Sequence, residues 1–406
     1  MQSMLVEFSV ENFLSFKEKV VFSMLASSDN EHEDYNVVTL PDGTRVLKSA
    51  VIYGANASGK SNLLKAIDFV STFVNESHIR QIGDPTGSIP FLLNKEFQGM
   101  ESKFQVIFYT SGVKYIYGFS CTELDVIEEY LYYYPKGAKA TIFEREDVSE
   151  YSFTVDKNEQ DKISKRNACN KLYISTAANW SYEKATKPFG FLRRLFLLTD
   201  SFSKEMLNKI NKSSSEDGEI RALEILNKWV NTIDVGISEI EILDNPDLNK
   251  TQDLFERIKT VHSLTDEDGG LRQHNFSYVN ESDGTKKFIL YSAYIIGALY
   301  LSYKNVIVDE LENKFHSLLS RFIIEQFHSE ETNPMNAQLI FTTHDTNLLD
   351  LTLFRRDQVY FTEKSIETGA TDLYSLDDFG VRKDAKIEKG YLMGKYGAIP
   401  FIGGVN

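Results

Sequence analysis

The stretch VIYGANASGKSNLLKAIDFV, residues 51–70, contains the pattern G-x-x-x-x-G-K-S between Gly54 and Ser61. The residues before it, SAVIY at 49–53, are mostly apolar and β-favouring, which predicts a short buried strand. Residues 61–74 place leucine, isoleucine and valine near helical spacing and predict an amphipathic helix. A strand, a glycine loop and a helix in this order are the context of a phosphate-binding P-loop. The alternative is an ordinary glycine turn, and both flanks argue against it.

The chemistry of a P-loop needs these residue types. Glycines let the backbone wrap around phosphates, so that N–H groups and the helix N-terminus face negative charge. Lys60 would reach the β- and γ-phosphates of ATP, and Ser61 would place its hydroxyl on Mg²⁺. ATP and Mg²⁺ are therefore the expected cofactors. The candidate nucleotide-binding residues of the loop are Gly54, Asn56, Ser58, Gly59, Lys60, Ser61 and Asn62.

The composition bounds the class of protein. The chain has 406 residues, 42% of them hydrophobic, which is enough for one large domain or two ordinary ones. It contains no apolar run long enough for a transmembrane helix and begins with no signal-peptide pattern, so we expect no membrane segment. Cys121 and Cys169 are its two cysteines, and they favour a reduced, cytoplasmic compartment. The net charge of -15 disfavours binding to DNA through bulk charge, so a DNA contact would need a local basic patch.

A second apolar strand ends in two carboxylates. Residues 306–308 are Val, Ile and Val, as in a fully buried parallel strand. Asp309 then falls at the carboxyl end of the strand, where open α/β sheets bind ligands, and it can hold Mg²⁺ through water. Glu310 follows and can polarise the attacking water, which makes it a catalytic candidate. A solvated acidic strand end is the weaker alternative, because the pair closes a buried strand.

A histidine follows a third predicted strand. Residues 339–341 are apolar, and Thr342, Thr343, His344 and Asp345 come next. Alone, His344 would more often be a hydrogen-bonded surface histidine. At the end of the strand that follows Asp309, it is well placed to touch a γ-phosphate, and we predict a catalytic role.

A serine and a glycine precede a long amphipathic helix. The segment reads Glu281, Ser282, Asp283, Gly284, Thr285. A serine hydroxyl and backbone N–H groups at a helix start can bind an anion, so Ser282 and Gly284 are nucleotide-binding candidates. A simple helix N-cap explains the same residues equally well in isolation.

Taken in order, these four elements resemble ABC-type ATPase domains. In that family the S-x-G signature faces the P-loop of a second subunit, so that ATP lies between two chains. The resemblance implies a homodimer with two ATP sites, and it leaves a higher oligomer open. The signature departs from the L-S-G-G-Q of transporters, since it reads E-S-D-G-T. That departure disfavours a transporter subunit.

Further segments narrow the resemblance. LVEFSVENFLSFKE, residues 5–18, is similar to the first strand and N-F-x-S-F of the RecF and overcoming-lysogenization-defect ATPases. DELENKFH, 309–316, is similar to their D-E-x-E-x-x-x-H, which places His316 in the loop after the acidic strand. Residues 354–364 and 373–401 resemble the C-terminus of AAA-domain ATPases (AAA15/AAA21-like) of bacterial abortive-infection and restriction-linked loci, the RloA or AbiLi type. The resemblance is weakest over residues 140–270.

The remaining segments complete the expected architecture. Residues 104–121 and 128–147 alternate apolar and polar side chains and predict antiparallel strands. Their tyrosines, 130 and 132–134, could stack on bases, although packing on a neighbouring strand is the commoner role. Residues 181–250 favour helices, and residues 211–219 and 264–273 favour polar loops. Because no heptad repeat persists along the chain, we expect no coiled-coil arms of the SMC type.

The predicted fold is an α/β ABC-ATPase (P-loop) fold with a mixed sheet core, an antiparallel β-subdomain and an inserted helical lobe. Its expected parts are residues 1–180, with the P-loop and the antiparallel subdomain; 181–280, the helical lobe; 281–365, with the signature, the acidic strand and His344; and 366–406, a C-terminal tail.

Two function classes follow. The first is an ATP-hydrolysing sensor or scaffold of an anti-phage abortive-infection system that controls a separate effector, for which a nuclease is the expected class. The second is a RecF/SMC-like DNA-repair ATPase that clamps DNA in its ATP-bound dimer. The acidic balance and the C-terminal resemblance favour the first. The 62 residues after His344 are too few for a nuclease domain, and the D-x-D at 266–268 is better explained as a solvated loop. Gln98 and Gln105 are candidates for the glutamine loop of ABC enzymes.

Overall fold

The computed structural model describes most of the chain, namely residues 3–199, 203, 206–207, 209–210, 222–233, 236–243, 257–265, 270–300, 305–313 and 316–399. The polar loop expected at 211–219 and the D-x-D at 266–268 lie outside the described residues.

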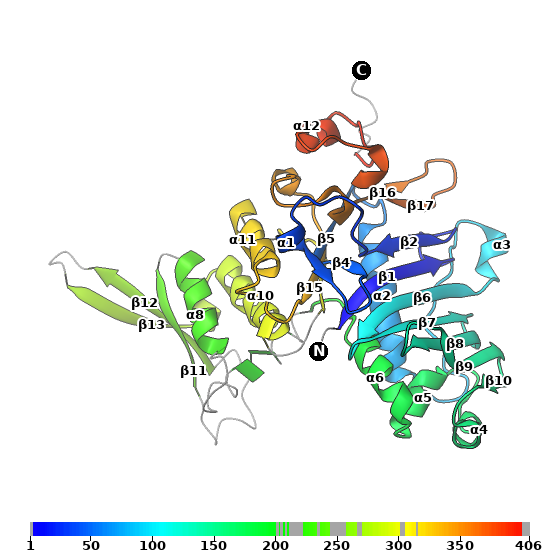
Figure 1. Cartoon of the computed structure of the whole chain (residues 1–406). Helices are drawn as coiled ribbons and strands as arrows, with labels where there is room; N and C mark the ends of the chain where they lie inside the picture. Colours follow the sequence, from blue (N-terminus) through cyan, green and yellow to red (C-terminus); the bar gives the residue numbers. More distant parts are fainter. Residues whose placement is uncertain are drawn as a thin grey trace.

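A five-stranded mixed sheet forms the centre of the molecule (Figure 1). Its order is β14 (Asn305–Val308), β15 (Gln338–Thr342), β5 (Ser49–Gly54), β16 (Val359–Lys364) and β17 (Thr371–Ser375). The first four strands are parallel and β17 is antiparallel to β16. Every residue of β14, β15 and β5 is buried, as expected for parallel strands that are covered on both faces. The predicted mixed sheet core is therefore confirmed.

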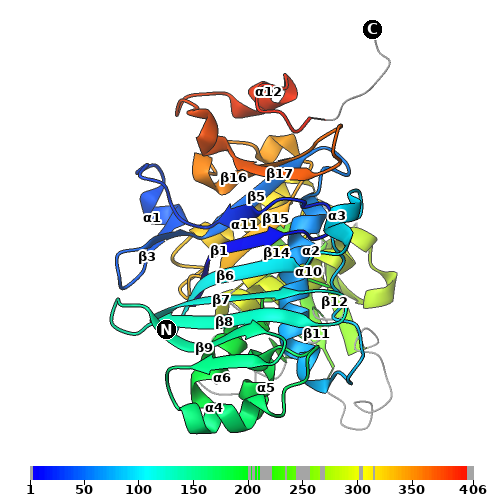
Figure 2. The ribbon, with the colours of Figure 1, turned by 90° about the vertical axis from the view of Figure 1, so that its right-hand side faces the viewer.

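A seven-stranded antiparallel sheet lies beside this core (Figure 2). Its strands, in spatial order, are β10 (Glu150–Phe153), β9 (Ala140–Asp147), β8 (Val126–Tyr134), β7 (Val113–Cys121), β6 (Ser102–Thr110), β1 (Met4–Glu11) and β2 (Val20–Ser23). The strands predicted within 104–121 and 128–147 belong to it. The antiparallel subdomain is thus confirmed as part of the fold.

The two faces of β5 pack against different layers. Ala50 and Ile52 share an apolar cluster with α2 (Lys60–Glu76) and the antiparallel sheet. Val51 and Tyr53 point to a second cluster with α10 (Asp283–Tyr300) and α11 (Ser317–His328). The alternation of a strand therefore places α2 on one side of the core sheet and α10 and α11 on the other.

The remaining described elements are short. Three helices lie on the α2 side of the core sheet, namely α4 (Lys157–Ser164), α5 (Tyr173–Asn179) and α6 (Glu183–Leu192). The first hundred residues also contain α1 (Glu33–Asn36), the strands β3 (Val37–Thr39) and β4 (Arg45–Leu47), and α3 (Lys95–Gln98).

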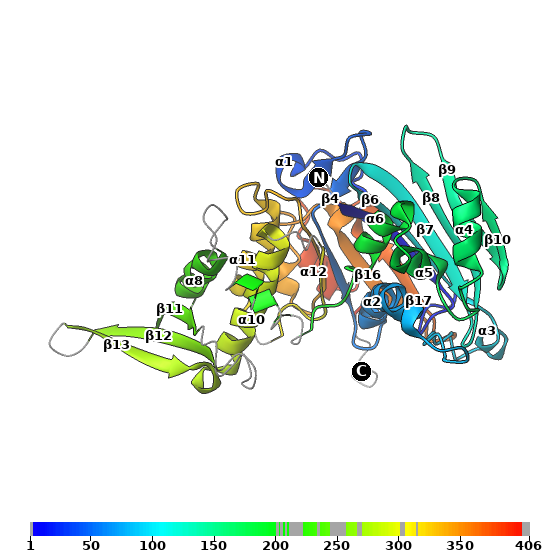
Figure 3. The same ribbon diagram turned by 90° about the horizontal axis from the view of Figure 1, so that it is seen from below.

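The segment expected to be a helical lobe also contains a sheet. After α8 (Ala222–Ile233) come β11 (Ile237–Ile242), β12 (Ile258–Thr265) and β13 (Leu271–Ser277), which form a three-stranded antiparallel sheet. The prediction of helix over 181–250 is wrong for residues 237–242, which form a strand whose register shifts between Ile237 and Glu239, so that Ile237 and Ile240, three positions apart, are both buried in a core shared with α8. The loop expected at 264–273 is also shorter, because strands extend into it from both sides. In Figures 1 and 3 the β12–β13 hairpin extends away from the body of the molecule.

The segment expected to be a C-terminal tail packs on the core sheet. It contributes β17 and α12 (Ile387–Leu392). Leu376, Tyr391 and Tyr396 are buried, and the ring of Tyr391 stacks on Phe361 of β16 with centroids 5.5 Å apart. Residues 400–406 lie outside the described part.

Candidate nucleotide-binding site

The glycines of the loop between β5 and α2 occupy positions where a side chain would not fit. Gly59 has φ +112°, a left-handed conformation, and an added Cβ would overlap the side chain of Thr371, with Cγ2 only 2.5 Å away. A Cβ on Gly54 would lie 2.5 Å from the hydroxyl oxygens of both Ser58 and Thr362. The residue type at both positions is therefore fixed by the close approach of neighbouring side chains.

Most backbone amides of the loop have no acceptor within the described part of the protein. The amide of Ser58 donates to the carbonyl of Ala55 over 3.2 Å. Among the described residues, no acceptor is found for the remaining amides from the loop into the first turn of α2, which belong to Ala55, Asn56, Ala57, Gly59, Lys60 and Ser61. Convergent free N–H groups at a helix N-terminus favour an anion such as a polyphosphate. The loop therefore fits the group that the sequence predicts.

Lys60 is the first residue of α2 and is almost completely buried. Its Nζ donates to the carbonyls of Gly54, over 2.8 Å, and Ala55, over 3.1 Å. Burial lowers the pKa of this lysine, and the nearby carboxylates of Asp309, Glu310 and Glu312 act in the opposite direction. The ammonium group thus lies at the loop, close to the acidic end of β14.

The acidic end of β14 is held by a threonine of the next strand. The hydroxyl of Thr342 donates to Asp309 Oδ1 over 2.6 Å and accepts the amide of Glu310 over 2.8 Å. Glu310 has a positive φ of 51° and an exposed side chain. A left-handed glutamate costs conformational energy, and such strain clusters at functional sites. Thr342 was not among the predicted site residues, although it lies in the segment that predicts His344.

His344 lies at the same edge of the core sheet. Its amide donates to Glu312 Oε1 over 2.6 Å, and its side chain is exposed. The amide of Thr343 donates to the carbonyl of Ile52 in β5 over 3.2 Å. Because β14, β15 and β5 are parallel neighbours, their carboxyl ends bring the P-loop, Asp309, Glu310 and His344 to one edge. Sequence reasoning gave no role to Glu312, whose contact with His344 depends on this strand order.

The candidate signature segment, residues 281–285, lies at the start of α10. The hydroxyl of Ser282 accepts the amide of Thr285 over 3.1 Å at the start of α10, which is the geometry of a helix N-cap. Its neighbour Glu281 accepts from the side chains of Thr260 and His262 in β12. Within the part of the chain that the structure describes, no hydrogen bond joins Ser282 or Gly284 to residues 54–61.

Other predicted candidates have structural contacts. His316 caps α11, with Nδ1 accepting the amide of Leu318 over 3.2 Å. The side chain of Gln98 donates to the carbonyl of Leu92 over 2.7 Å, and Gln105 accepts from Tyr130 over 2.8 Å. The ring of Tyr130 also stacks on Tyr132, with centroids 5.0 Å apart. These contacts favour the packing role for the tyrosines over base stacking.

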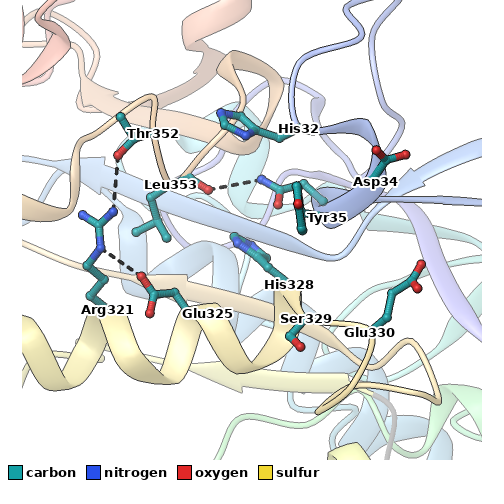
Figure 4. A pocket seen from close by; sticks show the side chains of 11 residues that line it. His32, Asp34, Tyr35, Arg321, Glu325, His328, Ser329, Glu330, Thr352 and Leu353 are labelled. Carbon is teal, nitrogen blue, oxygen red and sulfur yellow. Dashed lines mark hydrogen bonds and ion pairs between the residues drawn. The ribbon is translucent and has the colours of Figure 1, made fainter.

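A pocket of about 690 Å³ lies elsewhere on the molecule (Figure 4). It is lined by residues of α1 and α11 and by Leu353, and it includes His328. His328 Nε2 is 2.7 Å from the hydroxyl of Ser49, the first residue of β5. This pocket is therefore at the amino ends of the core strands, whereas open α/β sheets bind ligands at the carboxyl ends.

Neither a metal-binding cluster nor a membrane-spanning helix is present among the described residues. No group of three or more histidine, cysteine, aspartate or glutamate side chains there is arranged to hold a metal ion. No helix in the same part of the chain is long and apolar enough to span a membrane.

Comparison with known families decides the class. A family model described as "AAA domain, putative AbiEii toxin, Type IV TA system" matches residues 49–350, which is most of the chain. The chain belongs to this family. It is therefore an ATPase domain of the AAA/ABC type, as the sequence resemblance indicated.

Solved structures with a similar course of the chain include SMC heads. The SMC head domain from Thermotoga maritima has 12% sequence identity and a TM-score of 0.43, over 92% of this chain and 99% of that one. An SMC head bound to the C-winged helix domain of ScpA has 13% identity and a TM-score of 0.44, over 91% and 97%. No curated protein sequence matches the chain significantly.

Proposed function

We propose that this AAA-family chain binds and hydrolyses ATP with Mg²⁺, and that it is the sensor or scaffold of an anti-phage abortive-infection system. In that system it controls a separate effector, for which a nuclease is the expected class. One observation carries the ATPase part of the proposal. The free loop amides, Lys60 and the acidic end of β14 converge at a single edge of the core sheet.

Each side chain has a distinct proposed role. The proposed phosphate-binding groups are the backbone amides of the loop, which are hydrogen-bond donors, and Lys60, whose ammonium group is a cation at the loop. Ser61 and Asp309 are the candidates to hold Mg²⁺, the latter through water. When bound there, the metal would neutralise phosphate charge. Glu310 is the proposed general base that takes a proton from the attacking water, and His344 is the proposed contact for the γ-phosphate.

The proposed active unit is a homodimer. Ser282 is exposed, and it is joined by no hydrogen bond to the described P-loop of its own chain, so the proposed partner of Ser282 and Gly284 is the loop of a second copy. Gly284→Arg should leave ATP binding intact and block hydrolysis. Mixing it with Lys60→Ala places both lesions in one composite site of a mixed dimer and leaves the other site whole.

The mixture separates three outcomes. If the mixture of the two variants regains ATP hydrolysis, each composite site works independently. If a stable mixed dimer forms without hydrolysis, both sites must hydrolyse ATP in a concerted manner. A monomer that hydrolyses ATP at full rate would contradict the dimer and the proposed role of Gly284. The oligomeric state is measured by light scattering with and without ATP, on the Glu310→Gln variant to slow turnover.

The defence role rests on the family and on composition. The family description names a putative toxin and a type IV TA system, and residues 354–364 and 373–401 resemble ATPases of abortive-infection loci. The net charge of -15 argues against a general DNA clamp. The direct test is co-purification of a partner from the native host, followed by phage challenge with and without that partner. Hydrolysis stimulated by DNA, with no protein partner recovered, would replace this role with the DNA-repair alternative.

A further inference from the structure

Three hydroxyl-bearing residues from distant parts of the chain make hydrogen bonds with the P-loop and with the first turn of α2. Ser15 follows β1, Thr362 lies in β16, and Thr371 is the first residue of β17. All three are buried, with exposed fractions of 9%, 0% and 2%. Buried hydroxyls need hydrogen-bond partners, and here most of those partners belong to the loop and its flanks.

Each of these hydroxyls has one hydrogen to donate and can also accept hydrogen bonds. The side-chain amide of Asn62 donates to Ser15 Oγ over 2.8 Å. Thr371 Oγ1 lies 2.8 Å from Ser15 Oγ and 2.9 Å from the carbonyl oxygen of Ser58. Thr371 is the donor in both contacts, so its single hydrogen is shared between the oxygen of Ser15 and the carbonyl of Ser58, and Ser15 Oγ accepts from both Asn62 and Thr371. The hydroxyl of Thr371 therefore links Ser15 to the loop backbone at Ser58.

A second contact fixes the same loop residue. The hydroxyls of Ser58 and Thr362 are 2.7 Å apart, and Thr362 Oγ1 also lies 3.4 Å from the carbonyl of Tyr53. Either hydroxyl can donate in the bond between Ser58 and Thr362. The side chain of Ser58 is therefore held by Thr362 of β16, and its carbonyl by Thr371 of β17.

The orientation of the Ser58 carbonyl determines that of an amide. In a trans peptide unit the C=O of one residue and the N–H of the next point in opposite directions. A Ser58 carbonyl held toward Thr371 therefore aims the N–H of Gly59 the other way, and this N–H is one of the amides without an acceptor. Gly59 itself lies against Thr371 so closely that a Cβ would not fit.

We infer that Thr371 and Ser15 are positioning residues for nucleotide binding, which orient the loop amides toward the phosphates without touching the nucleotide. This inference rests on the proposed ATP binding at the loop. The amide of Thr371 also donates to the carbonyl of Ser15 over 2.8 Å. The shape of the loop thus depends on the connection between β1 and β2, which contains Ser15, and on β17, which begins with Thr371.

The test compares Thr371→Val with Thr371→Ser in the full chain. Valine keeps the shape and leaves the Ser58 carbonyl without its donor, whereas serine keeps the hydroxyl. The dissociation constant for ATP, measured by calorimetry, should rise about 5- to 150-fold in the valine variant, the range for a buried group left unsatisfied. The serine variant should remain within about 3-fold of the parent, since the bond is retained. In hydrolysis assays KM should rise in the valine variant while kcat changes little.

The outcomes are distinguishable. A parent chain that binds ATP and a valine variant with the same affinity would overturn the inference while leaving the proposed function intact. A parent chain that binds no ATP would overturn both. If Thr371→Val does not fold, Thr371→Ala removes the same hydroxyl with a smaller side chain and should weaken ATP binding in the same direction, and unchanged affinity in that variant would also overturn the inference.

Discussion

Gly59→Ala tests the geometry of the loop most directly. At φ +112° an alanine is in a disfavoured conformation, and its methyl carbon would lie 2.5 Å from Thr371 Cγ2. Thr371 is buried and hydrogen-bonded to the loop itself, so it has little room to move. The substitution therefore adds both backbone strain and an overlap inside a packed region.

The expected magnitude follows from these two terms. A residue held in a sparsely populated backbone conformation costs about 1–3 kcal/mol. An extra methyl group in a well-packed site costs about 1–3 kcal/mol more. If the loop keeps its shape, the free energy of unfolding should fall by about 2–6 kcal/mol. If the loop moves to relieve the overlap, part of this loss appears instead as weaker ATP binding, because the amides are no longer aimed at the phosphates.

The assay measures both quantities on the same variant. Urea titration followed by circular dichroism gives the change in unfolding free energy, and calorimetry gives the affinity for ATP. Gly190→Ala is the matched control, because Gly190 lies within α6 and an added Cβ there would meet no atom within 4 Å. The control should be neutral or more stable by up to about 1 kcal/mol, the difference in helix propensity. A Gly59→Ala variant with unchanged stability and unchanged ATP affinity would refute this account of the loop.

Three further predictions concern single side chains. Lys60→Ala should lose most ATP affinity without unfolding, and unchanged binding in calorimetry would contradict the P-loop assignment. Glu310→Gln should still bind ATP and hydrolyse it about 10²- to 10⁴-fold more slowly, and a parental rate of phosphate release would leave His344 as the first alternative base. Burial lowers the pKa of His328 from 6.5 to about 3. The unfolded chain therefore binds a proton below pH 6.5 that the folded chain does not, so unfolding free energy should fall by up to about 1.4 kcal/mol per pH unit toward pH 3. His328→Gln should remove that contribution, and acid unfolding curves of equal slope for variant and parent would exclude it.

The sequence alone determined the local features of this ATPase. Residues 51–70 predict a strand, a glycine loop and a helix, and all three are present as β5, the loop and α2. The apolar run at 306–308 and its two carboxylates predict a buried strand with an acidic end, and the structure contains β14 there. These features are readable because hydrophobic periodicity and glycine spacing act over a few residues and need no knowledge of distant neighbours.

The tertiary structure alone decided the contacts between distant segments. Thr371 meets Ser15 across 356 positions, and Gln358 meets Ser49 across 309. The sequence did not predict the sheet within residues 237–277, because the register shift between Ile237 and Glu239 breaks the period-2 pattern and its buried isoleucines pack in a cluster that includes α8. Which residue meets the Ser58 carbonyl depends on β5 lying next to β16, and strand order is a property of the folded sheet rather than of any local pattern. The residues of the phosphate loop can therefore be predicted from the sequence, whereas the residues that stabilise its conformation can be identified only from the pairing of distant strands.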